Sequence, residues 1–284
     1  MTTDEKLAAI LAAVQTDPGH RGLARDPHDN LFTATAGQFQ AACRSIADHP
    51  APVVAIFTGF WIPTATPPAF ETDGPLGVRL LDITFLAHRI TSCVDAEASV
   101  QQLYHDPFQP YNPRPVTHLV SCERPGPTAD GSFRTMRGID ITAEHEQVHG
   151  LYERIRDEDC PVTIGIGDGG NEIGMGSVSC ETMGKNIANA DRVRCVVDCD
   201  FLIVAGVSNW GAYALAAGVS LLRGGPAPLE FYDPKSERET LERMVEHVPL
   251  VDGVTGRQEA TVDGLPWDVY AAPLLRIREI LELP

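Results

Sequence analysis

The stretch that decides the fold is Val162-Thr-Ile-Gly-Ile166, which runs directly into Gly167-Asp-Gly-Gly-Asn-Glu-Ile-Gly-Met-Gly176. The first part is a short apolar run rich in β-branched residues, typical of a buried strand that leads into a loop. Residues 165–176 contain six glycines, more than a core segment would. Glycine adopts backbone conformations that other residues avoid, so unusual turns are predicted here. Such turns would let the side-chain oxygens of Asp168, Asn171 and Glu172 converge on one point.

Similar apolar runs occur elsewhere in the chain, and segments with helical periodicity lie between them. The other predicted strands are residues 52–57, 116–120 and the region 193–204, which could hold one long strand or a strand with a bend at residues 198–200. Helices are predicted over residues 3–14, 34–48, 77–89, 96–104, 141–157, 210–222 and 236–247. This alternation predicts an α/β layered fold with a mostly parallel sheet flanked by helices. In such a fold ligands bind beyond the carboxyl ends of the strands, where the glycine-rich acidic loops of this chain are expected.

Neither an internal repeat nor a flexible linker divides the sequence, so we expect a single domain over residues 1–284. Residues 1–50 would form a helical cover at its N-terminal end. The formal net charge of −17 disfavours nucleic acid and anionic membranes as partners. It also leaves carboxylates available for a hard divalent cation. The sequence leaves open whether copies of the chain associate into a homo-oligomer.

Several features indicate a cytoplasmic protein. The first ten residues carry acids and no basic segment before a short apolar stretch, unlike a secretory or mitochondrial signal. The 22 residues 201–222 carry no charge, but a strand, a turn and a short helix explain them better than a membrane span. The seven cysteines form no C-x-x-C pair, which fits a reducing compartment. Cys195 and Cys199 are interpreted as core thiols on the predicted strand that begins at Val193.

The glycine-rich loop admits two functional interpretations. Gly165, Gly167 and Gly170 match the G-x-G-x-x-G pattern of dinucleotide-binding proteins. Asp168 and Glu172 argue against it, because they would place two carboxylates against the pyrophosphate. The same loop, including Gly169, suits a metal or substrate site better.

Polar loops also follow three other predicted strands. Glu71-Thr-Asp73 follows the first strand after an aromatic and proline-rich loop, and Glu123 follows the second. Ser208 and Asn209 close the last strand and open a helix, a place that favours an anion such as a substrate carboxylate. Each loop alone is a weak signal, but together they predict a shared site at the strand ends.

One further motif points to a different class of enzyme. His145-Glu-Gln-Val-His149 matches the H-E-x-x-H pattern of zinc peptidases on a predicted helix. The apolar positions of that helix lie on the face that carries His145, and no recognisable third ligand follows. A helix with two partly exposed histidines is therefore the preferred interpretation.

These strings together resemble the D-glutamate cyclase family, which includes stand-alone bacterial and archaeal members and the C-terminal half of the animal mitochondrial enzyme. The most distinctive match is Thr163 to Gly176, supported by Glu71-Thr-Asp-Gly-Pro75, Glu123-Arg-Pro-Gly126 and Ala205-Gly-Val-Ser-Asn-Trp-Gly-Ala-Tyr213. Further similar blocks are residues 17–22, 58–60, 130–131, 136–138 and 253–256.

The resemblance implies an α/β fold, a divalent cation and a hydro-lyase that closes D-glutamate, or a related acidic amino acid, into 5-oxo-D-proline with loss of water. Manganese is the expected cation and magnesium the second choice. The chemistry of the loops then assigns the roles. Asp73, Asp168 and Glu172 are the predicted metal ligands, and Glu123, Asp168 and Glu172 the predicted catalytic residues. Thr58, Arg137, Ser208 and Asn209 are predicted to bind substrate, Arg137 by a bidentate pair with the α-carboxylate.

Two other functions remain open from the sequence. The acidic loops could hold cations around a phosphoryl group in a metal-dependent hydrolase such as a phosphatase. The same loops could also belong to a non-catalytic domain that binds an amino acid or a nucleotide.

Overall fold

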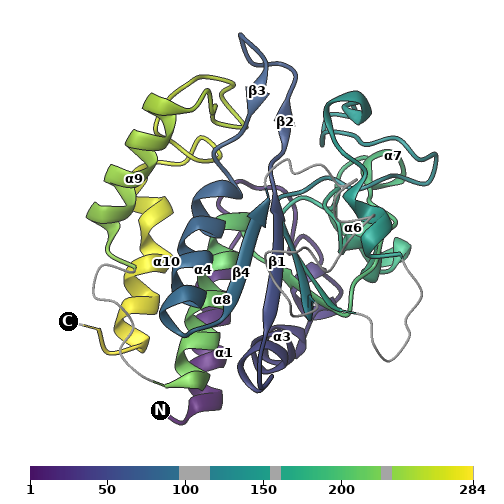
Figure 1. Cartoon of the computed structure of the whole chain (residues 1–284). Helices are drawn as coiled ribbons and strands as arrows, with labels where there is room; N and C mark the ends of the chain where they lie inside the picture. The colour runs from purple at the N-terminus through teal and green to yellow at the C-terminus, as the bar shows by residue number, and fades with distance from the viewer. Residues whose placement is uncertain (96–115, 154–160, 225–231, 284) are drawn as a thin grey trace.

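The computed structural model describes residues 1–95, 116–153, 161–224 and 232–283 (Figure 1). The strands of its main sheet are β1 (Val53–Thr58), β4 (Thr91–Asp95), β5 (His118–Cys122), β6 (Val162–Gly167) and β7 (Phe201–Val204). They are all parallel and lie in the order β4-β1-β5-β6-β7. A separate antiparallel ribbon, β2 (Trp61–Ile62) and β3 (Ala69–Phe70), projects from the loop after β1 (Figure 1). The predicted α/β fold is confirmed.

The strand order places a crevice at one edge of the sheet. From β1 the chain moves outward to β4 on one side and then crosses to β5 on the other side of β1. At such a reversal the loops that leave two neighbouring strands diverge, and ligands bind between them. The loops after β1 and β5 are therefore expected to border the site.

Long helices cover one face of the sheet. They are α1 (Thr3–Val14), α3 (Gln38–Ala47), α4 (Pro75–Ala87), α8 (Ser208–Arg223) and α10 (Trp267–Ile280), with α9 (Pro234–His247) packed on α10. Helix α8 lies in the middle of this layer and is buried over almost its whole length. Its apolar residues therefore pack between the sheet and other helices, which explains the long uncharged run in the sequence.

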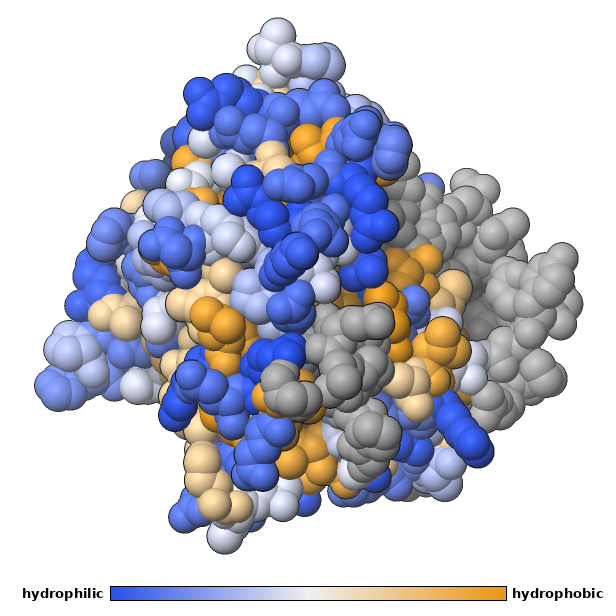
Figure 2. All heavy atoms as spheres, turned by 90° about the vertical axis from the view of Figure 1, so that its left-hand side faces the viewer, coloured by the Kyte–Doolittle hydropathy of each residue, from blue (hydrophilic) through white to orange (hydrophobic). Residues whose placement is uncertain are grey.

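The outer side of α9 faces solvent. It carries charged residues that pair along the helix, Lys235 with Glu239 and Arg238 with Glu242. The side of the molecule that contains α9 is mainly hydrophilic (Figure 2). No helix in the described ranges is both long and apolar enough to cross a lipid bilayer.

Shorter elements cover the opposite face of the sheet. They are α2 (Leu31–Ala34), α6 (Cys180–Asn186), α7 (Ala190–Val193) and the 3-10 turn η3 (Met175–Ser177), together with long loops. Strand residues alternate between the two layers: Val54 and Ile56 point to the long helices, whereas Ala55 and Phe57 point to the short ones. Both faces of the sheet are therefore buried, as the continuous apolar strands predicted.

The predicted strand over residues 193–204 is wrong for its first part, because only Phe201–Val204 pairs with the sheet. Residues 194–200 instead direct their backbone groups to the glycine-rich loop. The N–H groups of Gly174 and Gly176 donate to the Val197 carbonyl, each at 3.0 Å, and the Cys195 N–H donates to the Gly170 carbonyl at 3.0 Å. Cys195 and Cys199 are buried free thiols, as predicted, but on this irregular segment.

The predicted helix over residues 141–157 is also wrong. Its described part forms two 3-10 turns, η1 (Thr142–Glu144) and η2 (Val148–Leu151), and its last residues lie outside the described ranges. The predicted helix over residues 96–104 lies outside them entirely. Strand β4 and helix α10 were not predicted. The other predicted helices are confirmed, with ends shifted by a few residues.

Candidate active site

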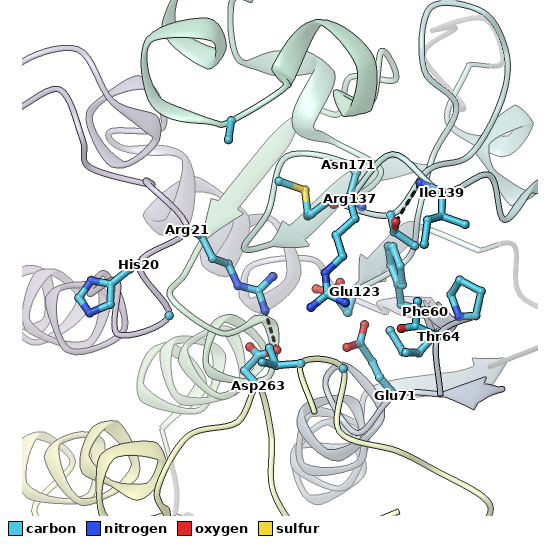
Figure 3. Close-up of a pocket in the computed structure, with 18 of the residues that line it drawn as sticks. His20, Arg21, Phe60, Thr64, Glu71, Glu123, Arg137, Ile139, Asn171 and Asp263 are labelled. Carbon is cyan, nitrogen blue, oxygen red and sulfur yellow. Dashed lines mark hydrogen bonds and ion pairs between the residues drawn. The ribbon is translucent and has the colours of Figure 1, made fainter. Parts of the chain in front are cut away.

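A cavity of about 390 Å³ lies at the carboxyl ends of β1, β5 and β6. Its wall includes residues from the loops after β1 and β5, among them Phe60, Glu71 and Glu123. It also includes Arg21 from the segment after α1 and Asp263 from the segment before α10. The side chains of these residues converge on the cavity (Figure 3). The strand order thus brings segments distant in sequence to one site.

The glycine-rich loop wraps around the carboxylate of its own Glu172. One oxygen, Oε1, accepts hydrogen bonds from the N–H groups of Asp168 at 2.9 Å and Gly169 at 2.6 Å. The other, Oε2, accepts from the Gly170 N–H at 2.7 Å. These backbone donors are the groups that would have cradled a pyrophosphate. The loop therefore uses them to fix a buried acid.

The predicted loop glycines are required by this geometry. Gly170 has φ +113°, which only glycine adopts readily. A Cβ at Gly167 would lie 2.9 Å from Cδ of Glu172, and one at Gly165 would lie 2.7 Å from the Ile173 carbonyl oxygen. A side chain at either position would displace the backbone that holds Glu172.

Asp168 is fully buried and is paired with an arginine that sequence reasoning did not place in the site. Its Oδ1 accepts a hydrogen bond from Nη1 of Arg21 at 2.8 Å, and Nη2 of the same guanidinium binds Oδ1 of Asp263 at 2.5 Å. The other oxygen, Oδ2, of both aspartates is buried and has no hydrogen-bond partner among the described residues. Two acceptor atoms are therefore free at the centre of the site.

Arg21 and Asp263 each had a weak signal in the sequence. Asp263 precedes a glycine, as Asp73 and Asp168 do, but it does not follow a predicted strand. Arg21 lies within the block 17–22 that resembles the family, yet that block carries no recognisable chemical motif.

Asp73 and Asn209 cap each other's helices. The Asp73 carboxylate accepts the backbone N–H groups of Ser208 at 2.9 Å and Asn209 at 2.8 Å, at the start of α8. In return, Oδ1 of Asn209 accepts the N–H groups of Gly74 at 2.9 Å and Gly77 at 2.6 Å, at the start of α4. The anion at the α8 N-terminus is thus a side chain of the protein. Contact of Ser208 or Asn209 with a substrate carboxylate stays a prediction.

Glu123 follows β5 in a left-handed backbone conformation, with φ +49°, that aims its side chain toward the cavity (Figure 3). Its Oε2 accepts a hydrogen bond from Oγ of Ser208 at 2.5 Å. Oγ1 of Thr58 lies buried nearby without a partner among the described residues. Glu123 and Thr58 are thus brought to the same place by adjacent strands, and their predicted roles remain untested.

The predicted substrate-binding Arg137 lies on the outer wall of the cavity. It is exposed, and its guanidinium points inward toward Glu123 (Figure 3). Arg25 lines the same cavity. The wall therefore offers guanidinium groups that are suited to carboxylates.

Burial gives the acidic groups of the site unusual proton affinities. Burial and the neighbouring carboxylates raise the pKa of Glu71 and of Glu123 well above the usual range. Burial likewise raises the pKa of Asp73 to about 7 and the pKa of Asp168 well above its usual range. Burial opposes the charge of Arg21, but Asp168 and Asp263 raise its pKa overall. The guanidinium thus stays charged among carboxyl groups that strongly favour a further cation or proton.

The acidic groups can hold a divalent cation. Oxygen atoms of Asp73, Asp168 and Asp263 lie within 4.8 Å of one another, and so do those of Glu123, Asp168 and Glu172. The unpartnered Oδ2 atoms of Asp168 and Asp263 fit the first group, because a hard cation prefers carboxylate oxygens. Asp73 and Glu172, by contrast, already accept several backbone N–H groups. Both remain predicted ligands.

The H-E-x-x-H motif does not form a zinc-peptidase helix, since its residues lie between and within η1 and η2. His145 is buried, and its Nε2 accepts the backbone N–H of Trp61 at 3.1 Å. Its ring packs among Phe60, Phe70 and Phe133. Burial lowers the pKa of His145 to about 3, so the ring is neutral. The motif therefore supports the aromatic core beside the ribbon.

Fold and site define an α/β protein with a small-molecule site at the carboxyl ends of its strands. Comparison with known proteins gives the particular family. The family model described as D-glutamate cyclase-like, C-terminal, matches residues 10–90 and 86–278. The chain belongs to this D-glutamate cyclase-like family.

One relative is the protein named D-glutamate cyclase, mitochondrial, from Homo sapiens. It is 27% identical over 331 aligned positions, which cover 97% of this chain and 52% of the human protein. The chain thus spans about half the length of the curated relative it matches.

Proposed function

We propose that the chain is a divalent-metal-dependent hydro-lyase that converts D-glutamate into 5-oxo-D-proline and water. The observation that carries the proposal is the cavity itself, which combines inward-facing guanidinium groups with buried carboxylates in a member of this family. Guanidinium groups suit the carboxylates of an acidic amino acid, and the buried acids suit its ammonium group and a cation.

Asp73, Asp168 and Asp263 would hold the cation, and Glu172 would complete the set or fix the loop that carries Asp168. Manganese is the preferred ion and magnesium the alternative, since the donors are all oxygens. When bound, the cation would neutralise and polarise the γ-carboxylate, which is otherwise a poor electrophile.

The side chains of the protein supply orientation and proton transfer. Arg137 binds the α-carboxylate, so that the amine and the γ-carboxyl group meet across the cavity. Ring closure forms a bond between the nitrogen and Cδ and breaks one bond between Cδ and oxygen. The ammonium group gives up two protons, and the departing oxygen leaves with two protons as water.

Glu123 is the residue proposed to move a proton to the departing oxygen. Burial and the neighbouring carboxylates raise the pKa of Glu123, which favours the protonated carboxyl group that a proton donor needs. Ser208 donates to Oε2 of Glu123, which leaves the other oxygen, Oε1, for the substrate. Thr58, on the adjacent strand β1, is proposed to contact the substrate carboxyl group that loses this oxygen.

The test is product formation by the purified chain. We expect D-glutamate to yield 5-oxo-D-proline, detected by proton NMR and chiral chromatography, faster than L-glutamate yields its enantiomer. Activity should disappear in a chelator and return with Mn²⁺ better than with Zn²⁺. Absence of lactam with Mn²⁺ or Mg²⁺ would refute the cyclase proposal. Full activity of the metal-free protein would refute its metal dependence, and phosphate release from a simple ester would favour a hydrolase.

A further inference from the structure

Glu71 is a buried carboxylate for which the proposed mechanism has no use. The residue is only 5% exposed, and its carboxylate points into the cavity (Figure 3). Its backbone is fixed, because its N–H donates to the Phe60 carbonyl at 3.0 Å and it forms a bridge with Val251. Among the hydrogen bonds and ion pairs of the described residues, none involves the Glu71 carboxylate. The backbone of Glu71 is thus fixed, whereas its carboxylate has no hydrogen-bond or ion-pair partner among the described residues.

The chain reserves space for this carboxylate. A Cβ at Gly253 would lie 1.8 Å from Oε2 of Glu71 and 3.0 Å from its Cδ. Any other residue at position 253 would push the carboxylate out of its place. The glycine is therefore needed for space rather than for backbone freedom, which indicates that the position of Glu71 matters to the site.

The partner that this carboxylate lacks is a cation. Its charged neighbours include Asp73 and Asp263, which repel it, whereas the guanidinium of Arg21 is already engaged by Asp168 and Asp263. Glu71 also belongs to neither of the acidic groups whose oxygens lie close enough together to share a metal ion. A buried carboxylate without a counter-charge is costly, so a small ligand with a positive group would be bound strongly there.

We propose that Glu71 binds the ammonium group of the substrate and that Gly253 keeps it in the required position. The site then selects amino acids with a free amino group over dicarboxylates of the same length that lack one. The identity of the amino acid rests on the proposed function, but the recognition of the ammonium group does not. With Arg137 opposite, the two contacts would orient the α-carbon of the bound molecule.

The experiment compares D-glutamate with glutarate, which has the same two carboxylates and no amine. Dissociation constants of both would be measured by calorimetry in Mn²⁺ for wild type, Glu71→Gln and Gly253→Ala. Brief titrations and NMR of the recovered ligand would account for turnover. Glu144→Gln, an exposed glutamate outside the cavity, and Gly184→Ala, where a Cβ meets nothing within 4 Å, are the matched controls. Circular dichroism would verify that each variant is folded.

We expect Glu71→Gln to weaken D-glutamate binding at least tenfold and to leave glutarate binding within threefold of wild type. Gly253→Ala should give the same pattern, and both controls should match wild type. If Glu71→Gln weakens the binding of both ligands equally, or the binding of neither, the proposal is overturned. It is also overturned if the wild-type protein binds both ligands equally or binds neither. Selective binding that is lost in Glu71→Gln, without any lactam from the wild type, would uphold the ammonium site and refute the cyclase function.

Discussion

Replacing Arg21 by methionine tests whether one guanidinium compensates the buried acids of the site. The substitution removes the partner of Asp168, whose side chain is 0% exposed, and of Asp263, whose side chain is 2% exposed. Removing one partner of a buried ion pair costs about 3 to 5 kcal/mol. Because the Arg21 side chain is itself 21% exposed, we take the lower end, about 3 kcal/mol at pH 7.5. For a chain of this size that lowers the melting temperature by about 6 °C.

The loss should depend on pH with a definite sign. The folded-state pKa of Asp168 and of Asp263 is raised by burial, so the folded protein binds more protons than the unfolded chain, and stability falls as pH rises above about 4. Arg21 opposes this rise in pKa, so Arg21→Met should steepen the fall in stability. At pH 5.5 the acids take up protons more readily, so the loss should be smaller than at pH 7.5.

The assay is urea unfolding at pH 5.5 and pH 7.5 in a chelator, followed by circular dichroism. Arg25→Met is the matched control, because Arg25 lines the same cavity but is exposed and forms no ion pair within the described ranges. It should change stability by less than about 0.5 kcal/mol. If Arg21→Met resembles this control at pH 7.5, or loses more stability at pH 5.5, the charge compensation inferred here is wrong.

Three further substitutions test other parts of the site. Asp168→Asn should weaken Mn²⁺ binding and lower turnover by about a hundredfold. The metal-free melting temperature should change little, because Arg21 stays paired with Asp263. Calorimetry and rate measurements check this, and near-normal values for both metal affinity and turnover would exclude Asp168 as a ligand. Asn209→Ala should cost about 1 to 2 kcal/mol in urea unfolding, since α4 loses its side-chain cap; an unchanged midpoint would contradict the reciprocal capping. The double variant His145→Ala with His149→Ala should keep most of its turnover per folded molecule, and a thousandfold loss would restore the zinc-peptidase interpretation.

The parts of the fold that follow simple periodicity could be predicted from the sequence. β1, β6 and α8 are continuous apolar runs buried on all sides, so composition alone locates them. β4 was missed because Thr91-Ser-Cys-Val-Asp95 is a short edge strand with few apolar residues. Helix α10 was missed because it contains Pro273, which normally argues against a helix interior.

Two acids of the site were predictable because each follows a strand. Glu123 and Asp168 come directly after β5 and β6, so the parallel sheet brings them together. Arg21 and Asp263 come from segments that follow no strand and are separated by 242 residues, and their contact depends on the tertiary packing of α1 and α10. Local patterns carry no information about such a pair.

Apart from Glu123, the acids of the site divide into two kinds according to where their oxygens are directed. Glu172 and Asp73 accept backbone N–H groups, from the glycine-rich loop and from the start of α8, so the protein itself stabilises their charge and uses them to fix the site. Glu71, together with Oδ2 of Asp168 and of Asp263, is left without such donors. A protein gains nothing in stability by burying uncompensated carboxylates, so the second kind is explained by what the cavity binds. Two of these unpartnered oxygens lie beside Arg21 and one pair lies at Glu71, so the proposed place for a metal ion differs from the proposed place for an ammonium group.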